Sequence, residues 1–150
     1  MTTARSDFDR ALERIGKGSH VSLTTFRRNG QGVPTPVGSL VHDGTLYALT
    51  PPDTGKAKRI RNNPQVTIAP CDMKGTVPDG VAAVPATARL LDPAETARVE
   101  EMMRRRFFMY RVVHLVDRAL RRERPLVAIA VRAQPPLGRG VPRDFPDTRS

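Results

Sequence analysis

Tryptophan is absent from this sequence of 150 residues, and the aromatic residues are five phenylalanines and two tyrosines. Proteins that bind single-stranded nucleic acid stack its bases on aromatic side chains, so the chain is poorly supplied for that role. Cys71 is the single cysteine, which excludes a disulfide within one chain and a metal site made of several cysteines. Such cysteine usage is typical of a reducing compartment, and we expect the protein to be cytoplasmic.

Long hydrophobic runs are also missing. No stretch approaches the roughly 18 apolar residues of a membrane-spanning helix, and the first ten residues, MTTARSDFDR, lack the apolar core of a secretory signal. His20, His42 and His114 do not have the paired spacing of metal ligands, so we expect no metal. No nucleophile motif or carboxylate pair stands out, and no catalytic residue is predicted. Cys71 ends an apolar stretch, where an inert buried thiol is favoured over a nucleophile.

Acidic residues are scarce beside basic ones. The chain has 25 Lys and Arg against 15 Asp and Glu, which gives a formal net charge of +10. Such a surface attracts anionic partners, which include nucleic acid, an acidic membrane and a phosphorylated small molecule. Because the basic residues are dispersed and stacking aromatics are few, we expect a small-molecule partner and no nucleic acid.

Alternating hydrophobic residues predict six β-strands, over residues 20–28, 32–42, 45–51, 65–71, 81–91 and 125–133. Asn29-Gly30 and Asp43-Gly44 are typical of tight turns, so the first three strands should form an antiparallel meander. Prolines cannot donate hydrogen bonds to a neighbouring strand, so the strands that contain Pro34, Pro36 and Pro85 should be edges or interrupted strands.

Helical spacing predicts three helices among these strands. The first begins at a Ser6 cap, runs to Ile15 and ends at Gly16. The second covers residues 54–63 with Thr54 as its cap, and the third covers residues 93 to about 122 with Asp92 as its cap.

Short strands joined by hairpin turns argue against a parallel sheet. The pattern favours a mainly β fold with peripheral helices, in which six mostly antiparallel strands form a small barrel. We expect this domain to span residues 1–133, with a tail rich in proline, glycine and arginine over residues 134–150.

The sharpest local feature is a basic cluster at the second helix, which contains Lys56, Lys58, Arg59 and Arg61. A helix N-terminus offers free N–H groups and partial positive charge, so these residues with the Thr54 hydroxyl suit a phosphate. A solvated basic helix face is the alternative.

Two further segments leave alternatives open. Residues 35–38 and 47–50 could bind a planar heterocycle through free main-chain groups, or the prolines could simply protect an edge strand from aggregation. Residues 102–111 mix bulky apolar residues with arginines. They fit an amphipathic helix, a lid in which Phe107, Met109 or Tyr110 meets a ligand, or a segment on an anionic membrane.

Residues 21–71 resemble the pyridoxamine 5′-phosphate oxidase-like split-barrel superfamily, and most closely its deazaflavin-dependent reductases, which use coenzyme F420. The resemblance rests on the order of several short motifs. They are LTTFRRNG at residues 23–30, TPV at 35–37, GTLY at 44–47, GKAKRIRNNP at 55–64, VTIAPC at 66–71 and ATARLL at 86–91.

This resemblance implies a homodimer of split β-barrels with two F420 sites at the interface. It implies that Lys56 holds the cofactor phosphate. The other implied cofactor-binding residues are Thr35, Pro36, Val37 and Leu49 beside the ring, Thr50, Thr54 and Lys58 on the phosphate side, and Arg59 and Arg61 toward the oligoglutamate tail or solvent.

The implied activity is hydride transfer between reduced F420 and an activated acceptor such as an enone, a quinone, a nitroaromatic or a tetrapyrrole-like molecule. The alternatives are an FMN-dependent oxidase or reductase of the same fold, and a non-catalytic cofactor-binding protein; some relatives bind haem. Gly38 and Ser39 stand where a bulky aromatic often follows TPV, which alters the space near the ring. Solvent or Tyr110 could supply a proton to the product.

Overall fold

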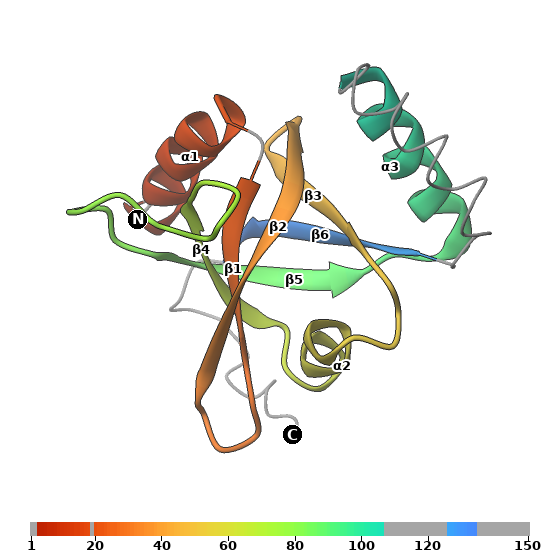
Figure 1. Ribbon diagram of the computed structural model, residues 1–150, viewed down its shortest axis with the longest axis horizontal. Helices are drawn as coiled ribbons and strands as arrows, with labels where there is room; N and C mark the ends of the chain where they lie inside the picture. The colour runs from red at the N-terminus through yellow and green to blue at the C-terminus, as the bar shows by residue number, and fades with distance from the viewer. Residues whose placement is uncertain (1–2, 19, 107–125, 135–150) are drawn as a thin grey trace.

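Six antiparallel pairings join the strands into a closed barrel in the order β1-β2-β3-β6-β5-β4 (Figure 1). The computed structural model describes residues 3–18, 20–106 and 126–134. The elements in chain order are α1 (Thr3–Gly16), β1 (His20–Phe26), β2 (Gly32–His42), β3 (Thr45–Thr50), α2 (Gly55–Asn62), β4 (Gln65–Pro70), β5 (Val84–Leu90), α3 (Pro93–Arg106) and β6 (Val127–Ala133). The predicted six-stranded antiparallel barrel with peripheral helices is confirmed. Within these described residues, no helix is both long and apolar enough to span a bilayer.

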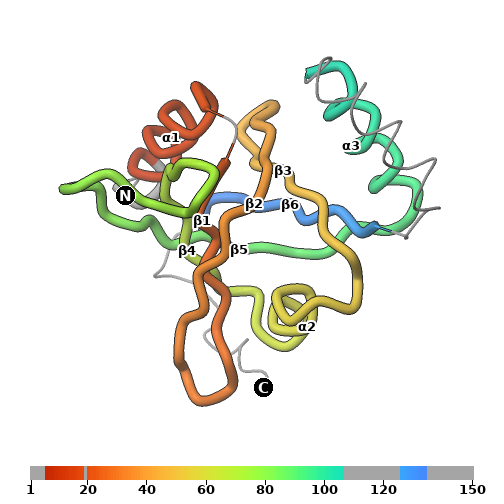
Figure 2. Tube along the Cα trace, viewed as in Figure 1, coloured from red at the N-terminus to blue at the C-terminus, as the bar shows by residue number. Residues whose placement is uncertain are grey.

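The core fills the barrel interior because alternate strand residues point inward. The inward set shares near-complete burial and includes Val21, Leu23, Leu46, Ile68, Ile129 and Val131. Helix α1 adds Phe8, Leu12 and Ile15 to this cluster, and α2 adds Ile60. The two helices lie at opposite ends of the barrel, α1 beside the start of β1 and α2 beside the β1–β2 hairpin (Figures 1 and 2).

The turns match their sequence signals. Gly30 has φ +91° and its N–H donates to the Arg27 carbonyl at 2.8 Å, which ends β1 at Phe26 rather than at residue 28. Asp43 and Gly44 both have positive φ, as a tight turn between β2 and β3 requires. The hairpin and meander predictions are therefore confirmed.

Several element boundaries differ from the predictions. The Ser6 cap was wrong, since α1 already begins at Thr3 and the good helix formers Ala4 and Arg5 extend it. Strand β5 begins at Val84 instead of residue 81, after the turn at Gly80. Helix α3 is described to Arg106, and its predicted continuation to residue 122 lies outside the described residues.

The prolines lie where a strand has one neighbour only. Pro34 and Pro36 pair with β1, while β3 pairs with β2 only from Ser39 to His42. Pro85 pairs with β4, and β6 begins its pairing with β5 at Ala86. In a closed barrel no strand is an edge along its whole length, so the edge prediction holds only for these half-strands.

Helix α3 packs on the outside of the barrel through a second apolar cluster. It contains Leu91, Val99, Ala128 and Ala130, with Tyr47, Leu49, Met102 and Met103 packed against it. The helix begins with a reciprocal cap, in which Asp92 Oδ1 accepts from Glu95 N at 2.7 Å and Glu95 Oε1 accepts from Asp92 N at 3.1 Å. Met102 and Met103 pack against the barrel, as the amphipathic interpretation of residues 102–111 requires, and residues 107–111 lie outside the described residues.

We expect Thr96→Val to lower the free energy of unfolding by about 1–3 kcal/mol. The buried Thr96 Oγ1 accepts a hydrogen bond from Ala128 N at 3.0 Å, which ties α3 to β6. Valine has the same shape but leaves the buried N–H without an acceptor. Urea unfolding measures the loss, and Thr96→Ser, which keeps the hydroxyl, should retain most of the stability; equal losses for both variants would contradict the role of this bond.

Candidate functional site

The barrel is split between β2 and β3 at the end occupied by α2. Residues 32–38 of β2 pair only with β1, and Leu49 and Thr50 of β3 pair only with β6. The chain then passes directly from Thr50 through a short loop into α2. The structure thus brings the two predicted ring-binding segments to facing stretches of neighbouring strands, beside the predicted phosphate-binding helix.

Side-chain direction divides the predicted ring-side residues. Val37 is in the barrel core, and Thr35, two residues away, lies on the same inner face. Thr50 is also buried, with 2% of its surface exposed. Pro36 faces outward near Gly75, and Leu49 faces outward beneath α3. A ligand outside the barrel could therefore touch Val37 only through its main chain, whereas the side chain of Thr35 is only half-buried.

Thr54 organises the start of α2. It has an extended backbone conformation, its Oγ1 accepts from Ala57 N at 3.3 Å, and the same hydroxyl donates to the Pro51 carbonyl at 3.0 Å. Thr50 Oγ1 lies 3.2 Å from Thr54 Oγ1. The predicted cap is confirmed, and the hydroxyl of Thr54 is already engaged in holding the loop. In the first turn of α2, the N–H groups of Gly55 and Lys56 are donors that the helix itself does not use.

Arg59 is part of the same end of the barrel. Its Nε donates to Thr25 Oγ1 at 2.7 Å, and Thr25 is fully buried. A Cβ added at Gly55 would lie 2.8 Å from Arg59 Nη1, so the guanidinium rests against this glycine. A side chain at position 55 would displace the end of Arg59, which links α2 to β1 while keeping its charge at the helix start.

Lys56 is the half-buried cation of this site. Burial lowers its pKa, and the neighbouring charge of Arg59 lowers it further. Within the described part of the chain, no carboxylate forms an ion pair with Lys56, Lys58 or Arg59. Two cations and a helix N-terminus therefore lie together without an ion-pair partner among the described residues, which favours a bound anion.

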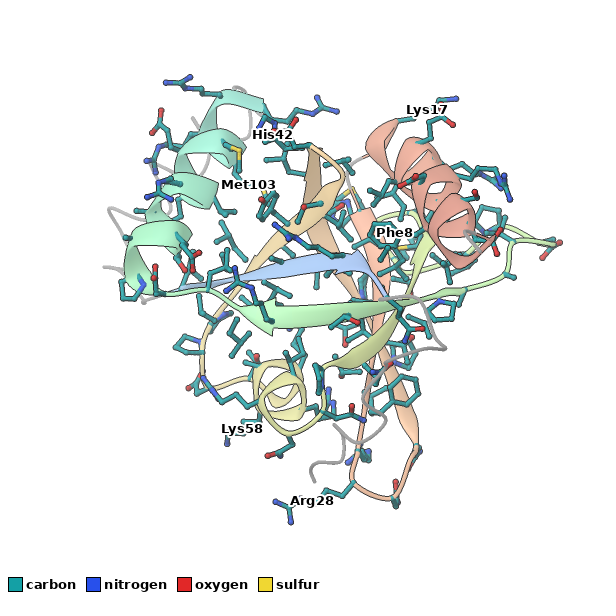
Figure 3. All side chains as sticks on the ribbon, turned by 180° about the vertical axis from the view of Figure 1, so that it is seen from behind. Phe8, Lys17, Arg28, His42, Lys58 and Met103 are labelled. Carbon is teal, nitrogen blue, oxygen red and sulfur yellow. The ribbon has the colours of Figure 1, made fainter. Side chains whose placement is uncertain are left out.

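The more exposed basic residues surround this position. Lys58 points away from α2, and Arg28 on the β1–β2 hairpin lies at the same end of the molecule, opposite Lys17 (Figure 3). Arg61 is exposed, and its Nη2 donates to the Pro52 carbonyl at 3.1 Å. These residues extend the positive surface beyond Lys56, whereas Arg61 is partly committed to the loop before α2.

The remaining candidates divide into two groups. Cys71 is half-buried, and burial together with Asp72 raises the pKa of its thiol, which fits an inert thiol. Across residues 3–18, 20–106 and 126–134, no three His, Cys, Asp or Glu side chains are grouped to hold a metal. Phe107, Met109 and Tyr110, which the sequence offered as possible lid residues, and Tyr110 also as a possible proton donor, lie outside the described residues.

Sequence analysis missed Thr25 and the structural role of Gly55. Thr25 and Arg59 are 34 positions apart, so no local spacing connects them. The only signal was a threonine at an inward position near the end of a predicted strand. A polar residue there needs a partner from whatever covers that end of the barrel.

Known proteins were found to match this chain in a family model and in solved structures. A family model described as pyridoxamine 5′-phosphate oxidase matches residues 9–134. No curated protein matches the sequence. The similar solved structures have low identity, so they show the fold alone.

Three of these structures differ in what their names say they bind. The heme storage protein HutZ from Vibrio cholerae has a TM-score of 0.58 and 17% identity, over 88% of this chain and 89% of that one. An FAD-binding protein from Mesorhizobium loti has a TM-score of 0.55 and 15% identity, over 84% and 87% of the two chains. An F420 reductase has a TM-score of 0.51 and 18% identity, over 83% and 93%.

Proposed function

Because the chain belongs to the pyridoxamine 5′-phosphate oxidase family, we propose that it is an oxidoreductase whose cofactor is F420, with its phosphate at the start of α2. The observation that carries this proposal is the uncompensated pair Lys56 and Arg59 beside the α2 N-terminus. The motif order of residues 21–71 supports F420, and an F420 reductase is among the proteins that share this fold.

The residues present fit a phosphorylated ring cofactor. The Lys56 amine can donate charge-assisted hydrogen bonds to a phosphate, and the free N–H groups of the first turn of α2 add neutral donors. Residues 35–37 and Leu49 border the split between β2 and β3, where main-chain groups can orient a ring. Lys58 is exposed nearby and can attract further negative charge.

The chain's own contribution is binding, orientation and exclusion of water. Bound F420 in its reduced form would supply a hydride for an activated acceptor such as an enone, a quinone, a nitroaromatic or a tetrapyrrole-like molecule. We propose that the active protein is a homodimer with its cofactor sites at the subunit interface, and that residues 134–150 form a tail separate from the domain. FMN is the alternative cofactor, supported by the similarity to an FAD-binding protein.

Parallel fluorescence titrations with oxidised F420 and with FMN test the proposal. Tight F420 binding with weak FMN binding is expected, and the reverse would assign the chain to a flavin. Binding of neither would overturn the cofactor proposal. Turnover of the F420-loaded protein with a panel of enones, quinones and nitroaromatics then separates an enzyme from a cofactor-binding protein without catalysis.

A further inference from the structure

A groove of about 480 Å³ runs between α3 and the outer face of the sheet. Tyr47 on β3, Ala130 on β6 and Arg89 on β5 form one row across its floor, because Ala130 pairs with both of the others. One face of α3 forms the wall through Glu95, Arg98, Val99, Met102 and Arg105. In Figure 3, Met103 on this helix and His42 at the end of β2 mark the same side of the molecule.

Small side chains keep this groove open. Strand β6 turns Ala128 and Ala130 toward α3, and both are buried under the helix or at the floor of the groove. A larger apolar residue at position 130 would fill the space between Tyr47 and Met102. The volume lies within the range of about 300–1,000 Å³ that small-molecule sites occupy.

The charges of the groove are only partly compensated. Arg89 Nη2 lies 3.5 Å from Glu95 Oε2, and Arg105 Nε lies 3.2 Å from Glu101 Oε2. Arg98 on α3 and Arg132 on β6 also line the groove, and neither forms an ion pair within the described residues. The helix and the sheet therefore each present an arginine without a carboxylate partner among the described residues, beside the apolar part of the floor at Tyr47 and Ala130.

The geometry points to a second ligand site here, for an amphipathic organic anion. Its apolar body lies over Tyr47 and Ala130 beside Met102, and its carboxylate or sulfonate binds Arg98 and Arg132. Guanidinium groups suit this role because they pair with carboxylates in a fixed fork and also stack on flat apolar surfaces. Arg98 and Arg132, which carry the inference, are not among the residues of the cofactor site at α2, so the inference does not depend on the proposed function.

Titration with 8-anilinonaphthalene-1-sulfonate, a fluorescent amphipathic anion, tests this site in the full-length protein. We expect saturable binding, and a dissociation constant raised about tenfold or more in the double variant Arg98→Gln, Arg132→Gln, since two charge-assisted contacts are lost. Ala130→Leu, which fills the floor without changing charge, should also weaken binding. Arg10→Gln on the exposed face of α1 is the matched control and should leave the dissociation constant unchanged. Thermal unfolding of each variant shows that the probe reports on the folded protein.

Three results would overturn the inference. Unchanged probe affinity in both the double variant and Ala130→Leu would place the probe elsewhere. A double variant that loses F420 affinity as strongly as probe affinity would make the groove part of the cofactor site. A change in sedimentation without a change in probe affinity would make it an interface between copies of the chain. Failure of the wild-type protein to bind F420 would overturn only the proposed function, because the probe experiment is read independently.

Discussion

Replacing Phe8 by alanine should lower the free energy of unfolding by about 3–5 kcal/mol. Phe8 is 1% exposed and belongs to the main core cluster, which α1 enters at one end of the barrel (Figure 3). Removing the ring leaves a cavity between α1 and the strands that rigid β-structure cannot collapse to fill. Since small domains are stable by about 5–15 kcal/mol, this change removes a large share of the total.

Urea unfolding gives this difference through the midpoint, provided that the slope stays constant. Phe26→Ala is the matched control, because the same atoms are removed from a half-buried ring at the end of β1. We expect a loss of about 1–2 kcal/mol for the control, in proportion to the smaller buried area. Equal losses at the two positions would mean that α1 does not close the barrel.

Local chemistry made much of this fold predictable. Thr54 was predicted as a cap because a threonine hydroxyl can accept from the first turn of a helix, and it accepts from Ala57 N. Asn29-Gly30 predicted the first hairpin because glycine adopts the positive φ that Gly30 has. The inward set of each strand followed from the two-residue period, as Val21 and Leu23 show.

Long-range geometry was not predictable in the same way. Strand β6 lies between β3 and β5, so Ala130 contacts both Tyr47 and Arg89, and no spacing in the sequence indicates this order. The groove under α3 depends on that placement and on alanines that look like ordinary strand residues. The contact between Arg59 and Thr25 also arises only when the barrel closes against α2.

The candidate site combines features that the sequence predicted with features that it did not. The sequence identified Lys56 and its helix, because the basic cluster and the cap are local features. It treated Val37 and Leu49 as equivalent ring neighbours, although one points into the core and the other outward beneath α3. The two-residue period of a strand is enough to predict which way each side chain points. The sequence does not show where β2 and β3 separate, because that depends on how the barrel closes.

Lys56→Ala should raise the dissociation constant for F420 about 5–150-fold, which corresponds to about 1–3 kcal/mol. The lysine supplies charge-assisted hydrogen bonds to the phosphate, and the loss stays within this range because Arg59, although its Nε is held by Thr25, keeps its charge and its Nη groups at the site. Lys17→Ala removes the same side chain from the opposite end of the barrel and should leave the constant unchanged (Figure 3). Equal affinity of Lys56→Ala and wild-type protein would show that the phosphate does not bind at this site.

The pH dependence of binding distinguishes a charge effect from a general disturbance. In the free protein, burial and Arg59 lower the pKa of Lys56, so the amine loses its proton at a lower pH than an ordinary lysine. A bound phosphate favours the charged amine, so affinity should be full below that pKa and fall as pH rises through it. In the absence of ligand, the lowered pKa of Lys56 has the opposite effect on the free energy of unfolding. The folded state disfavours the charged amine, so the protein becomes more stable as pH rises through the lowered pKa. Lys56→Ala should abolish both slopes, and a variant that weakens binding yet keeps the alkaline loss of affinity would assign that loss to another group.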